Sequence, residues 1–339
     1  KTLTRDLADG RGMDATVFGL NYEQKIGGWD LSNKANYFDG DLNTISMFTG
    51  NNPVSAAAYL AAANAAHNPR AAAGSGSMTY VKGGAVAPDQ QVVQAGLWSV
   101  EKQLKSFTNE FRASRELIKN HTFTAGIYHA DYKSNDEWYL GNSHLMTATP
   151  NASLIDVRLN NGVIVSNRGV DGNVFYAPTA SYKGDNTAVF IADEFKVNDR
   201  IKLDVGARRE KQSRHANISN LTSMDTDNNP LTVYNNGTSM ATGTFTQLSR
   251  DDSVNSFTAG ALFKLSENAS VFARANKGHT FIFFDDMRNA GSQAALNDRN
   301  GVPTPEVSQY EVGFKTATPL YSAYINAFFT DFSGISFQQ

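Results

Sequence analysis

The sequence predicts an all-β fold, an antiparallel up-and-down β-barrel that crosses a membrane, and three observations lead to this prediction. Ten segments alternate polar and apolar residues with period two, as strands with one wet face and one apolar face do. The connections between these segments are alternately very short and very long. No run of about 18 apolar residues could form a transmembrane helix, whereas a barrel strand needs only about 9–11 residues to cross.

The alternation is clear near the C-terminus. In residues 306–315, one face carries Ser308, Tyr310, Val312 and Phe314, and the other carries Gln309, Glu311, Gly313 and Lys315. A break at residues 316–319 precedes a second aromatic-rich run, residues 321–337. This pattern predicts a β-hairpin, and we expect its apolar face to meet lipid.

The same reasoning predicts ten strands along the chain. They cover residues 13–24, 29–41, 92–117, 121–140, 185–196, 200–215, 252–265, 269–280, 306–315 and 321–337. In residues 200–209, for example, Ile201, Leu203, Val205 and Ala207 alternate with polar residues and glycine. We expect these strands to form a meander in chain order.

The lengths of the connections predict which end of the barrel is periplasmic and which is extracellular. Residues 25–28, 118–120, 197–199, 266–268 and 316–319 are short and rich in the Gly, Asn, Asp and Pro of tight turns. Residues 42–91, 141–184, 216–251 and 281–305 are long, and loops of that length usually have a function. Outer-membrane barrels have short periplasmic turns and longer extracellular loops.

Two long connections have predicted structure of their own. Residues 55–67 are rich in Ala and predict a short helix. Residues 154–159 and 163–166 flank Asn160, Asn161 and Gly162, which predicts a hairpin on an Asn-Gly turn.

The amino-acid composition argues against several classes of function. The 30 basic and 33 acidic residues give a net charge of −3, so we expect no general attraction to nucleic acid. The chain has no Cys and therefore no disulfide and no Cys-ligated metal. It begins at Lys1 without Met or a signal peptide, so we expect a processed or trimmed N-terminus.

Three strand–turn–strand units resemble the barrel hairpins of TonB-dependent outer-membrane receptors. They are residues 106–115 with 122–132, residues 188–195 with 199–209, and residues 305–315 with 327–332. Their order and their separation by long loops strengthen the resemblance, which covers most of residues 106–337 and, more loosely, residues 13–41. One departure lies after Gly278, where the chain continues with residues 279–284 instead of the aromatic, Arg and Pro usual in the family.

The resemblance implies a function in the bacterial outer membrane. Such a receptor binds a scarce ligand (a siderophore, a vitamin or an oligosaccharide) with its extracellular loops and imports it with energy from the TonB system. Transporter barrels of this class have 22 strands and a plugged lumen. We therefore expect residues 1–339 to form part of the barrel, about ten of its strands, with the plug domain and the C-terminal strands outside this chain. The large, aromatic and Asn-rich loops favour carbohydrate or another large ligand.

The implied partners are outer-membrane lipid and lipopolysaccharide, a TonB-type energy-coupling protein that acts through the plug, the substrate, and a surface lipoprotein. Two alternatives stay open. A passive porin-type channel would have the same wall without a plug. A soluble, secreted, β-rich carbohydrate-binding protein would dissolve without detergent, but it would leave the placement of all long loops at one end unexplained.

Neither catalysis nor a cofactor is expected. The six His are scattered, without the HExxH motif, and the sequence contains neither a nucleophile elbow nor a P-loop. Glu110 and Glu311 could form a glycosidase pair, but their place on polar strand faces favours a lumen-facing role. Asp225 and Asp227 could hold calcium, although a solvated turn is the favoured interpretation and no metal site is predicted.

Aromatic residues of the long connections are the candidate ligand-binding residues, because aromatic rings stack on sugars and grip large ligands. For each residue taken singly, packing within the loop is the favoured interpretation; as a group they mark where a ligand would be met first. Trp138 and Tyr139 at a strand end could instead belong to an aromatic girdle at the membrane interface. The candidates are Phe48, Tyr59, Trp138, Tyr139, Phe175, Tyr176, Tyr182 and Tyr234.

Overall fold

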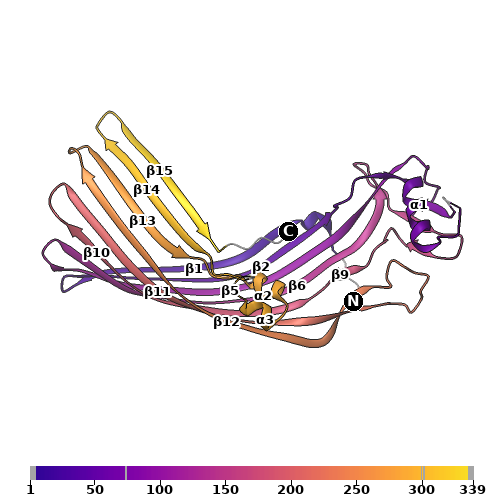
Figure 1. Ribbon diagram of the computed structural model, residues 1–339, viewed down its shortest axis with the longest axis horizontal. Coiled ribbons are helices and arrows are strands. Elements are labelled where there is room, and N and C mark those ends of the chain that lie inside the picture. The colour runs from indigo at the N-terminus through magenta and orange to yellow at the C-terminus, as the bar shows by residue number, and fades with distance from the viewer. Residues whose placement is uncertain (1–4, 73–74, 299, 301, 335–339) are drawn as a thin grey trace.

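The computed structural model describes residues 5–72, 75–298, 300 and 302–334, and its main feature is one long antiparallel sheet (Figure 1). Ten strands, called the wall strands below, follow one another across it in chain order. They are β1 (Arg11–Ile26), β2 (Trp29–Phe48), β5 (Gln91–Ile118), β6 (His121–Thr147), β10 (Thr179–Lys196), β11 (Ile201–Met224), β12 (Thr238–Lys264), β13 (Ala269–His279), β14 (Glu306–Ala317) and β15 (Ser322–Ser333). This is the predicted up-and-down meander. A single turn of 3-10 helix, Leu7–Asp9, precedes it.

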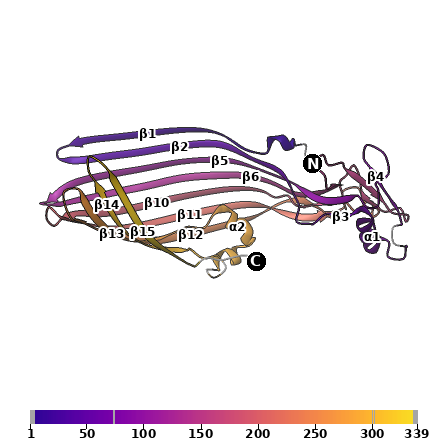
Figure 2. The same cartoon turned by 90° about the horizontal axis from the view of Figure 1, so that it is seen from above.

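The short turns gather at one end of the wall, as predicted (Figure 2). Between β1 and β2, Gly27 and Gly28 have φ of 57° and 83°. A two-residue type I′ turn requires positive φ at both positions, which glycine adopts without a steric penalty. The Gly-Gly sequence therefore fixes the register of this hairpin, from Ile26 opposite Trp29 up to Arg11 opposite Thr44.

The wall strands differ greatly in length. β5, β6 and β12 have 28, 27 and 27 residues, whereas β13, β14 and β15 have 11, 12 and 12. A strand rises about 3.3 Å per residue, so the long strands reach far beyond a hydrocarbon layer of about 30 Å. The strands in the middle of the wall are therefore long enough to have one part that spans such a layer and a second part beyond it.

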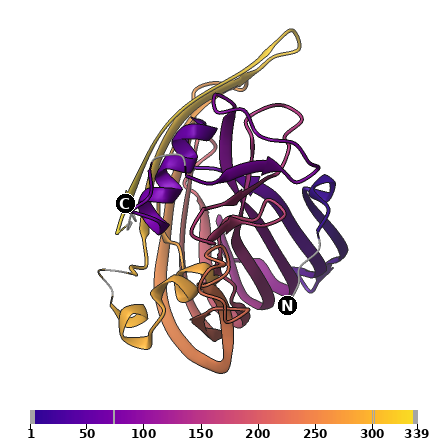
Figure 3. The same ribbon diagram turned by 90° about the vertical axis from the view of Figure 1, so that its right-hand side faces the viewer.

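The wall is curved into an open trough (Figure 3). Among the described residues, β1 pairs only with β2 and β15 only with β14, so the two edges of the sheet do not meet. None of the described helices is long and apolar enough to cross a membrane.

At the far end of the long strands, connecting segments fold into a lobe with its own hydrophobic core, called the loop lobe below. It consists of the described parts of residues 49–90, 148–178 and 225–237, and it contains β3 (Val54–Ser55), α1 (Ala56–His67), β4 (Ser77–Tyr80), β7 (Ile155–Arg158), β8 (Ile164–Ser166) and β9 (Val174–Tyr176). Strands β4, β7 and β8 form a small separate sheet. Val92, Leu145, Ile155 and Val157 are fully buried in the core.

The connection between β13 and β14 folds back onto the wall. Its helices α2 (Phe284–Ala290) and α3 (Gln293–Asn297) bury Met287 and Leu296 completely. These side chains form a second core with Leu248 of β12 and Tyr182 of β10. The loop is thus packed against the wall itself and is separate from the loop lobe.

All ten predicted strands are present, and their ends at the short turns agree within two residues. The predicted helix at residues 55–67 is α1, with Ser55 as its N-cap, and the predicted hairpin is β7 and β8, with Gly162 at φ 89°. Residues 335–337 of the last predicted strand lie outside the described residues. In the described part of the chain, β15 ends at Ser333.

At the other end, the predicted boundaries of β1, β5, β13 and β14 agree within two residues, but five others are wrong. Strands β2, β6 and β11 continue seven, seven and nine residues beyond the predicted ends at residues 41, 140 and 215, and β10 and β12 begin six and fourteen residues before residues 185 and 252. Three long connections therefore shrink to residues 49–90, 148–178 and 225–237. The physical reason is that neither face of these strand extensions meets hydrocarbon, and part of them is covered by the loops, so their sequences lose the regular apolar–polar alternation.

Candidate functional site

The two faces of the wall can be followed through the strand registers, because directly opposed residues of antiparallel strands lie on the same face. From β1 to β15 one face carries a continuous band of large apolar side chains, called the hydrophobic belt below. Each is at least 38% exposed: Phe18, Leu20, Tyr37, Phe111, Ile127, Val189, Ile191, Leu203, Val205, Phe257, Phe263, Tyr310, Val312, Ile325 and Phe329. An exposed apolar band of this extent identifies a lipid-facing surface.

At the short-turn edge of the belt lies an aromatic cluster. The His121 ring stacks on Phe195 at 4.0 Å between centroids, and its Nδ1 lies 2.8 Å from Oδ2 of Asp193. The Arg115 guanidinium lies 5.6 Å from the centre of the Trp29 ring. Amphipathic rings and charged tips of this kind are typical of the membrane–water interface, so the belt ends here.

The opposite face of the wall, called the inner face below, carries ion pairs at the same level, together with exposed aromatic side chains of β15 such as Phe328. Ion pairs join Arg112 to Glu110 at 2.6 Å and Arg208 to Glu210 at 2.8 Å. A third pair, 3.0 Å long, joins Arg274 on β13 to Asp204 on β11 across β12. Charged pairs opposite a lipid-facing band indicate a polar lumen, as the sequence pattern predicts for Glu110 and Glu311.

Above the belt, the inner face carries a cluster of three predicted aromatic residues. Trp138 on β6 lies under the guanidinium of Arg288 from α2, 3.9 Å from the ring centre. Arg288 also donates from Nη1 to the Tyr176 hydroxyl, at 3.1 Å. The ring of Tyr182 stacks on Phe284 of α2 at 4.8 Å, and Tyr182 is only 3% exposed. These aromatic residues therefore anchor α2 to the wall.

Four charged side chains of this cluster form ion pairs with one another. Lys102 pairs with buried Asp136 at 3.0 Å and with Asp285 of α2 at 3.4 Å, and its Nζ lies 5.2 Å from the centre of the Trp138 ring. Arg288 reaches Asp285 at 3.5 Å. Two cations thus meet two carboxylates among these four side chains, and a third cation, Arg214 of β11, lies 5.3 Å from the centre of the Phe284 ring. Burial raises the pKa of the Tyr182 hydroxyl, as does the charge on Asp136, so this group stays protonated.

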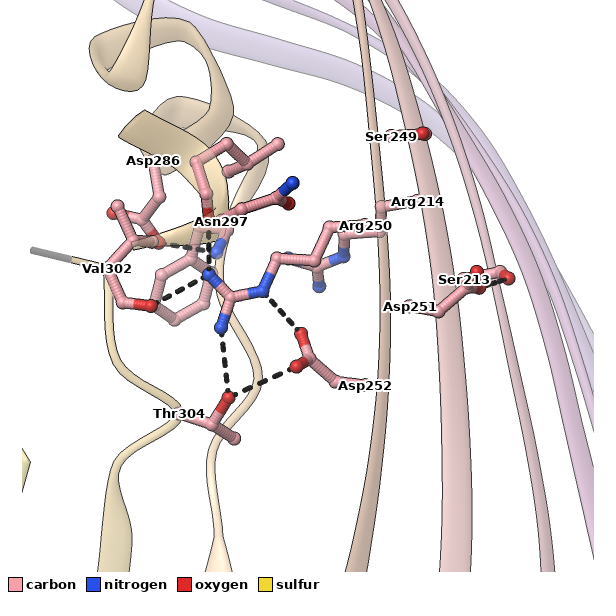
Figure 4. Close-up of polar contacts among 12 residues, drawn as sticks. Ser213, Arg214, Ser249, Arg250, Asp251, Asp252, Asp286, Asn297, Val302 and Thr304 are labelled. Carbon is pink, nitrogen blue, oxygen red and sulfur yellow. Dashed lines mark hydrogen bonds and ion pairs between the residues drawn. The ribbon is translucent and has the colours of Figure 1, made fainter. Parts of the chain in front are cut away.

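A single buried arginine holds the rest of the β13–β14 connection (Figure 4). Arg250 of β12 donates from Nη1 to the carbonyls of Leu296 and Val302, at 2.9 and 2.7 Å, and from Nε to Asp252 at 2.8 Å. Its Nη2 donates to Thr304 Oγ1 at 3.2 Å. Because Arg250 is 5% exposed, these bonds form away from water and fix the loop to the wall.

In the loop lobe, Tyr59 of α1 takes part in a polar contact beside a cavity. Its hydroxyl donates to Oδ2 of Asp171 at 2.9 Å, and Gln94 Nε2 donates to the same oxygen at 2.8 Å. Burial raises the pKa of Tyr59, and the nearby Asp171 charge and hydrogen bond add to the effect. Burial lowers the pKa of nearby His144, so its ring favours the neutral form.

The remaining four predicted aromatic residues lie apart from these clusters. Phe48 is 48% exposed and contacts Trp98 at 4.7 Å between ring centres, and Phe175 is 63% exposed. Tyr139 lies on the same face as the belt but above it, because it is opposite Ser99 in the register. The Tyr234 hydroxyl accepts from Asn167 Nδ2 at 3.2 Å. The eight candidates therefore do not form one site, and ligand contact stays a prediction for each.

Sequence reasoning missed the polar partners of these aromatic residues. Lys102, Arg250, Arg288 and Asp171 have no motif, and each comes close to its partner only through the fold. A weak signal exists for Arg250 and Asp252, which are two residues apart on one face of a strand. The strand was predicted to begin only at residue 252, so this pairing could not be seen.

The calcium alternative at Asp225 and Asp227 gains no support from the geometry. Asp225 Oδ1 accepts from the backbone N–H of Asp227, and Asp227 accepts from the Thr232 hydroxyl and the Asn229 N–H. These bonds describe a hydrogen-bonded turn. In the described part of the chain, no group of three or more His, Asp or Glu side chains is arranged to hold a metal ion.

The sequence matches the β-barrel of the family described as TonB dependent receptor-like over residues 2–339. The chain belongs to the TonB-dependent receptor family. Its members are outer-membrane β-barrel proteins of Gram-negative bacteria, which places this wall in the outer membrane. The short turns are then periplasmic, and the loop lobe is extracellular. A comparison with curated proteins gave no match.

Two solved receptors share the fold at low sequence identity. The siderophore receptor PiuA from Acinetobacter baumannii has a TM-score of 0.56 at 12% identity, covering 94% of this chain and 40% of PiuA. The ferric yersiniabactin uptake receptor FyuA from Yersinia pestis has a TM-score of 0.51 at 10% identity, covering 94% of this chain and 35% of FyuA. The chain therefore spans about two-fifths of the length of these receptors or less.

Proposed function

We propose that this chain forms part of the barrel wall of an active-transport receptor. Its extracellular loops bind a scarce ligand, and import uses energy from a TonB-type coupling protein. Membership of the TonB-dependent receptor family supports this function over a passive porin. The observation that carries the proposal is the separation of two surfaces along the same strands, a hydrophobic belt at one end and a folded, extracellular loop lobe at the other.

The two unpaired edges of the wall indicate that it is part of a larger barrel. Unpaired backbone groups in hydrocarbon cost several kcal/mol each, so an open sheet edge is not stable in a bilayer. β1 and β15 each have a free edge among the described residues. We infer that further strands pair with both edges, because family barrels have 22 strands around a plug. We propose that those strands and the plug domain belong to the same protein and lie outside residues 1–339.

The partners follow from the two surfaces. The belt contacts outer-membrane lipid, and the polar wall above it lies at the level of lipopolysaccharide. The plug is the contact for the TonB-type protein, and the extracellular lobe is the place for a surface lipoprotein. A siderophore, a vitamin and an oligosaccharide are all compatible with a large extracellular lobe. PiuA is described as a siderophore receptor and FyuA as a ferric yersiniabactin uptake receptor, but their 10–12% identity supports only the fold.

The conductance of the full-length protein in a planar lipid bilayer tests the proposal. A plugged receptor should show no steady conductance under native conditions, and it should conduct after moderate urea unfolds the plug while the barrel stays folded. A porin would conduct steadily before urea is added, and that outcome would overturn the assignment as a receptor. The same protein after removal of urea is the control, because refolding of the plug should close the pore again.

A further inference from the structure

A cavity of about 580 Å³ lies in the loop lobe beside α1, and none of the residues that anchor α2 to the wall line it. Its volume is within the range of about 300–1,000 Å³ that is usual for small-molecule sites. The apolar part of its wall is made of short aliphatic side chains: Val54, Ala58, Ala62, Val92, Val165 and Val233. The polar part comes from Asn51, Asn52, Tyr59, His67, Gln94 and Asp171.

Asp171 is the one carboxylate among the residues that line this cavity. A carboxylate has about four lone-pair positions, two on each oxygen. Oδ2 receives the hydroxyl of Tyr59 and the amide of Gln94, which are both neutral donors. Oδ1 is buried and has no hydrogen-bond partner in the described part of the molecule. Because Oδ1 is closed to an atom the size of water, a donor in the cavity would reach the carboxylate at Oδ2, beside Tyr59 and Gln94. A carboxylate held only by neutral donors is costly unless a cation lies close to it.

The charge on Asp171 is also not neutralised. No ion pair to Asp171 occurs within the described ranges, and the lining includes neither Lys nor Arg. His67 lines the cavity and His144 lies near Asp171; burial lowers the pKa of His144, which favours its neutral form. The cavity therefore presents one negative charge beside an apolar wall.

We propose that this cavity binds the cationic head and apolar body of an amine-bearing ligand, with Asp171 accepting hydrogen bonds from the protonated amine. The aliphatic side chains surround the body of the ligand, and Tyr59 and Gln94 hold the carboxylate in place. An anionic head would be repelled by Asp171, and a neutral hydroxyl would leave its charge uncompensated. The inference rests on the proposed function only in treating the loop lobe as the ligand-binding end, and it names a chemical class for one part of the ligand.

Three probes with the same body test the head group: cyclohexylmethylamine, cyclohexylmethanol and cyclohexanecarboxylate. Binding is measured by saturation-transfer NMR on the full-length protein in nanodiscs at pH 8, where the probe amine is protonated and the probe carboxylate is ionised. The amine should bind at least about tenfold more tightly than the alcohol, as expected for a charge-assisted hydrogen bond, and the carboxylate more weakly than both. Equal affinity of the amine and the alcohol, or tighter binding of the carboxylate, would overturn the proposal.

Variants locate the site. Asp171→Asn preserves shape and should reduce amine affinity about tenfold, to that of the alcohol, with partition into lipid unchanged. Ala62→Phe leaves Asp171 intact, fills the cavity and should abolish binding of the amine and the alcohol alike. Asp89→Asn, at an exposed carboxylate outside the lining, is the matched control and should bind as the unaltered protein does. Undiminished amine binding in both Asp171→Asn and Ala62→Phe would refute the site. Because binding is measured without TonB, a failed conductance test would leave this result unaffected.

Discussion

The belt-bearing half of the wall and the loop end of the same strands are stabilised in different ways. In the belt-bearing half, apolar side chains face lipid and charged pairs such as Arg274–Asp204 lie half-exposed on the inner face. At the loop end, apolar side chains such as Leu145 and Met287 are buried inside the protein, and charged groups such as Arg250 are buried with them. The environment around a single strand therefore changes along its length, from lipid to protein interior and water. A given kind of substitution should have different effects in the two parts.

The largest effect is expected from removing a buried charge at the loop end. Arg250→Ala removes the buried cation that donates to Asp252 and to two loop carbonyls, and breaking a buried pair in this way typically costs about 3–5 kcal/mol. The loop, not the whole barrel, should lose order, because the wall pairs independently. Hydrogen exchange should therefore rise throughout α2 and α3 and stay unchanged in β10 and β11.

Arg274→Ala is the control for this prediction. Its guanidinium is 45% exposed in its pair with Asp204, and exposed pairs contribute only about 0–1 kcal/mol. Exchange in the neighbouring strands should change little. If Arg250→Ala leaves α2 and α3 as protected as before, hydrophobic packing around Met287 and Leu296 is sufficient to hold the loop, and the role given to Arg250 is wrong.

The second effect tests the lipid-facing surface. Val312→Arg places a cation on the belt in the middle of β14, where it is 57% exposed, and a charge at this depth costs about 2–4 kcal/mol. Gln309→Arg, on the inner face of the same strand, should cost less than about 1 kcal/mol. Guanidinium unfolding of the full-length protein in lipid vesicles measures both. Equal destabilisation by the two substitutions would show that the two faces have been assigned wrongly.

These two regions also explain how much the sequence could predict. Beside lipid, alternate residues face hydrocarbon and a polar lumen, so the period-two pattern is visible and strand ends such as Trp29, His121 and Ala269 were placed correctly. Above the bilayer this contrast disappears. Thr238–Asp251 therefore reads as a loop although it continues β12. The wall was predictable because its environment differs on the two faces.

The candidate site was less predictable because it depends on contacts between distant segments. Trp138, Tyr176 and Tyr182 were found as aromatic residues near loops, but the sequence contains no sign that Arg288, more than a hundred positions later, lies between two of these rings. The same holds for Asp171, which meets Tyr59 across 112 positions. Local chemistry was predictable where the partner is near in sequence, as for the N-cap of α1.

That N-cap gives the smallest expected effect and shows how the loop lobe is held. The Ser55 hydroxyl accepts the backbone N–H of Ala58 at 3.2 Å, and replacing such a cap with Ala costs about 1 kcal/mol. Ser55→Ala should raise hydrogen exchange in α1 about fivefold, whereas Ser55→Asp, which keeps an acceptor, should leave it unchanged. A much larger rise, with loss of protection in β7 and β8, would mean that α1 and the small sheet unfold as one unit. No rise at all would mean that burial of Ala56 and Ala63 in the lobe core is enough to hold the helix, as packing at the loop end would then outweigh local capping.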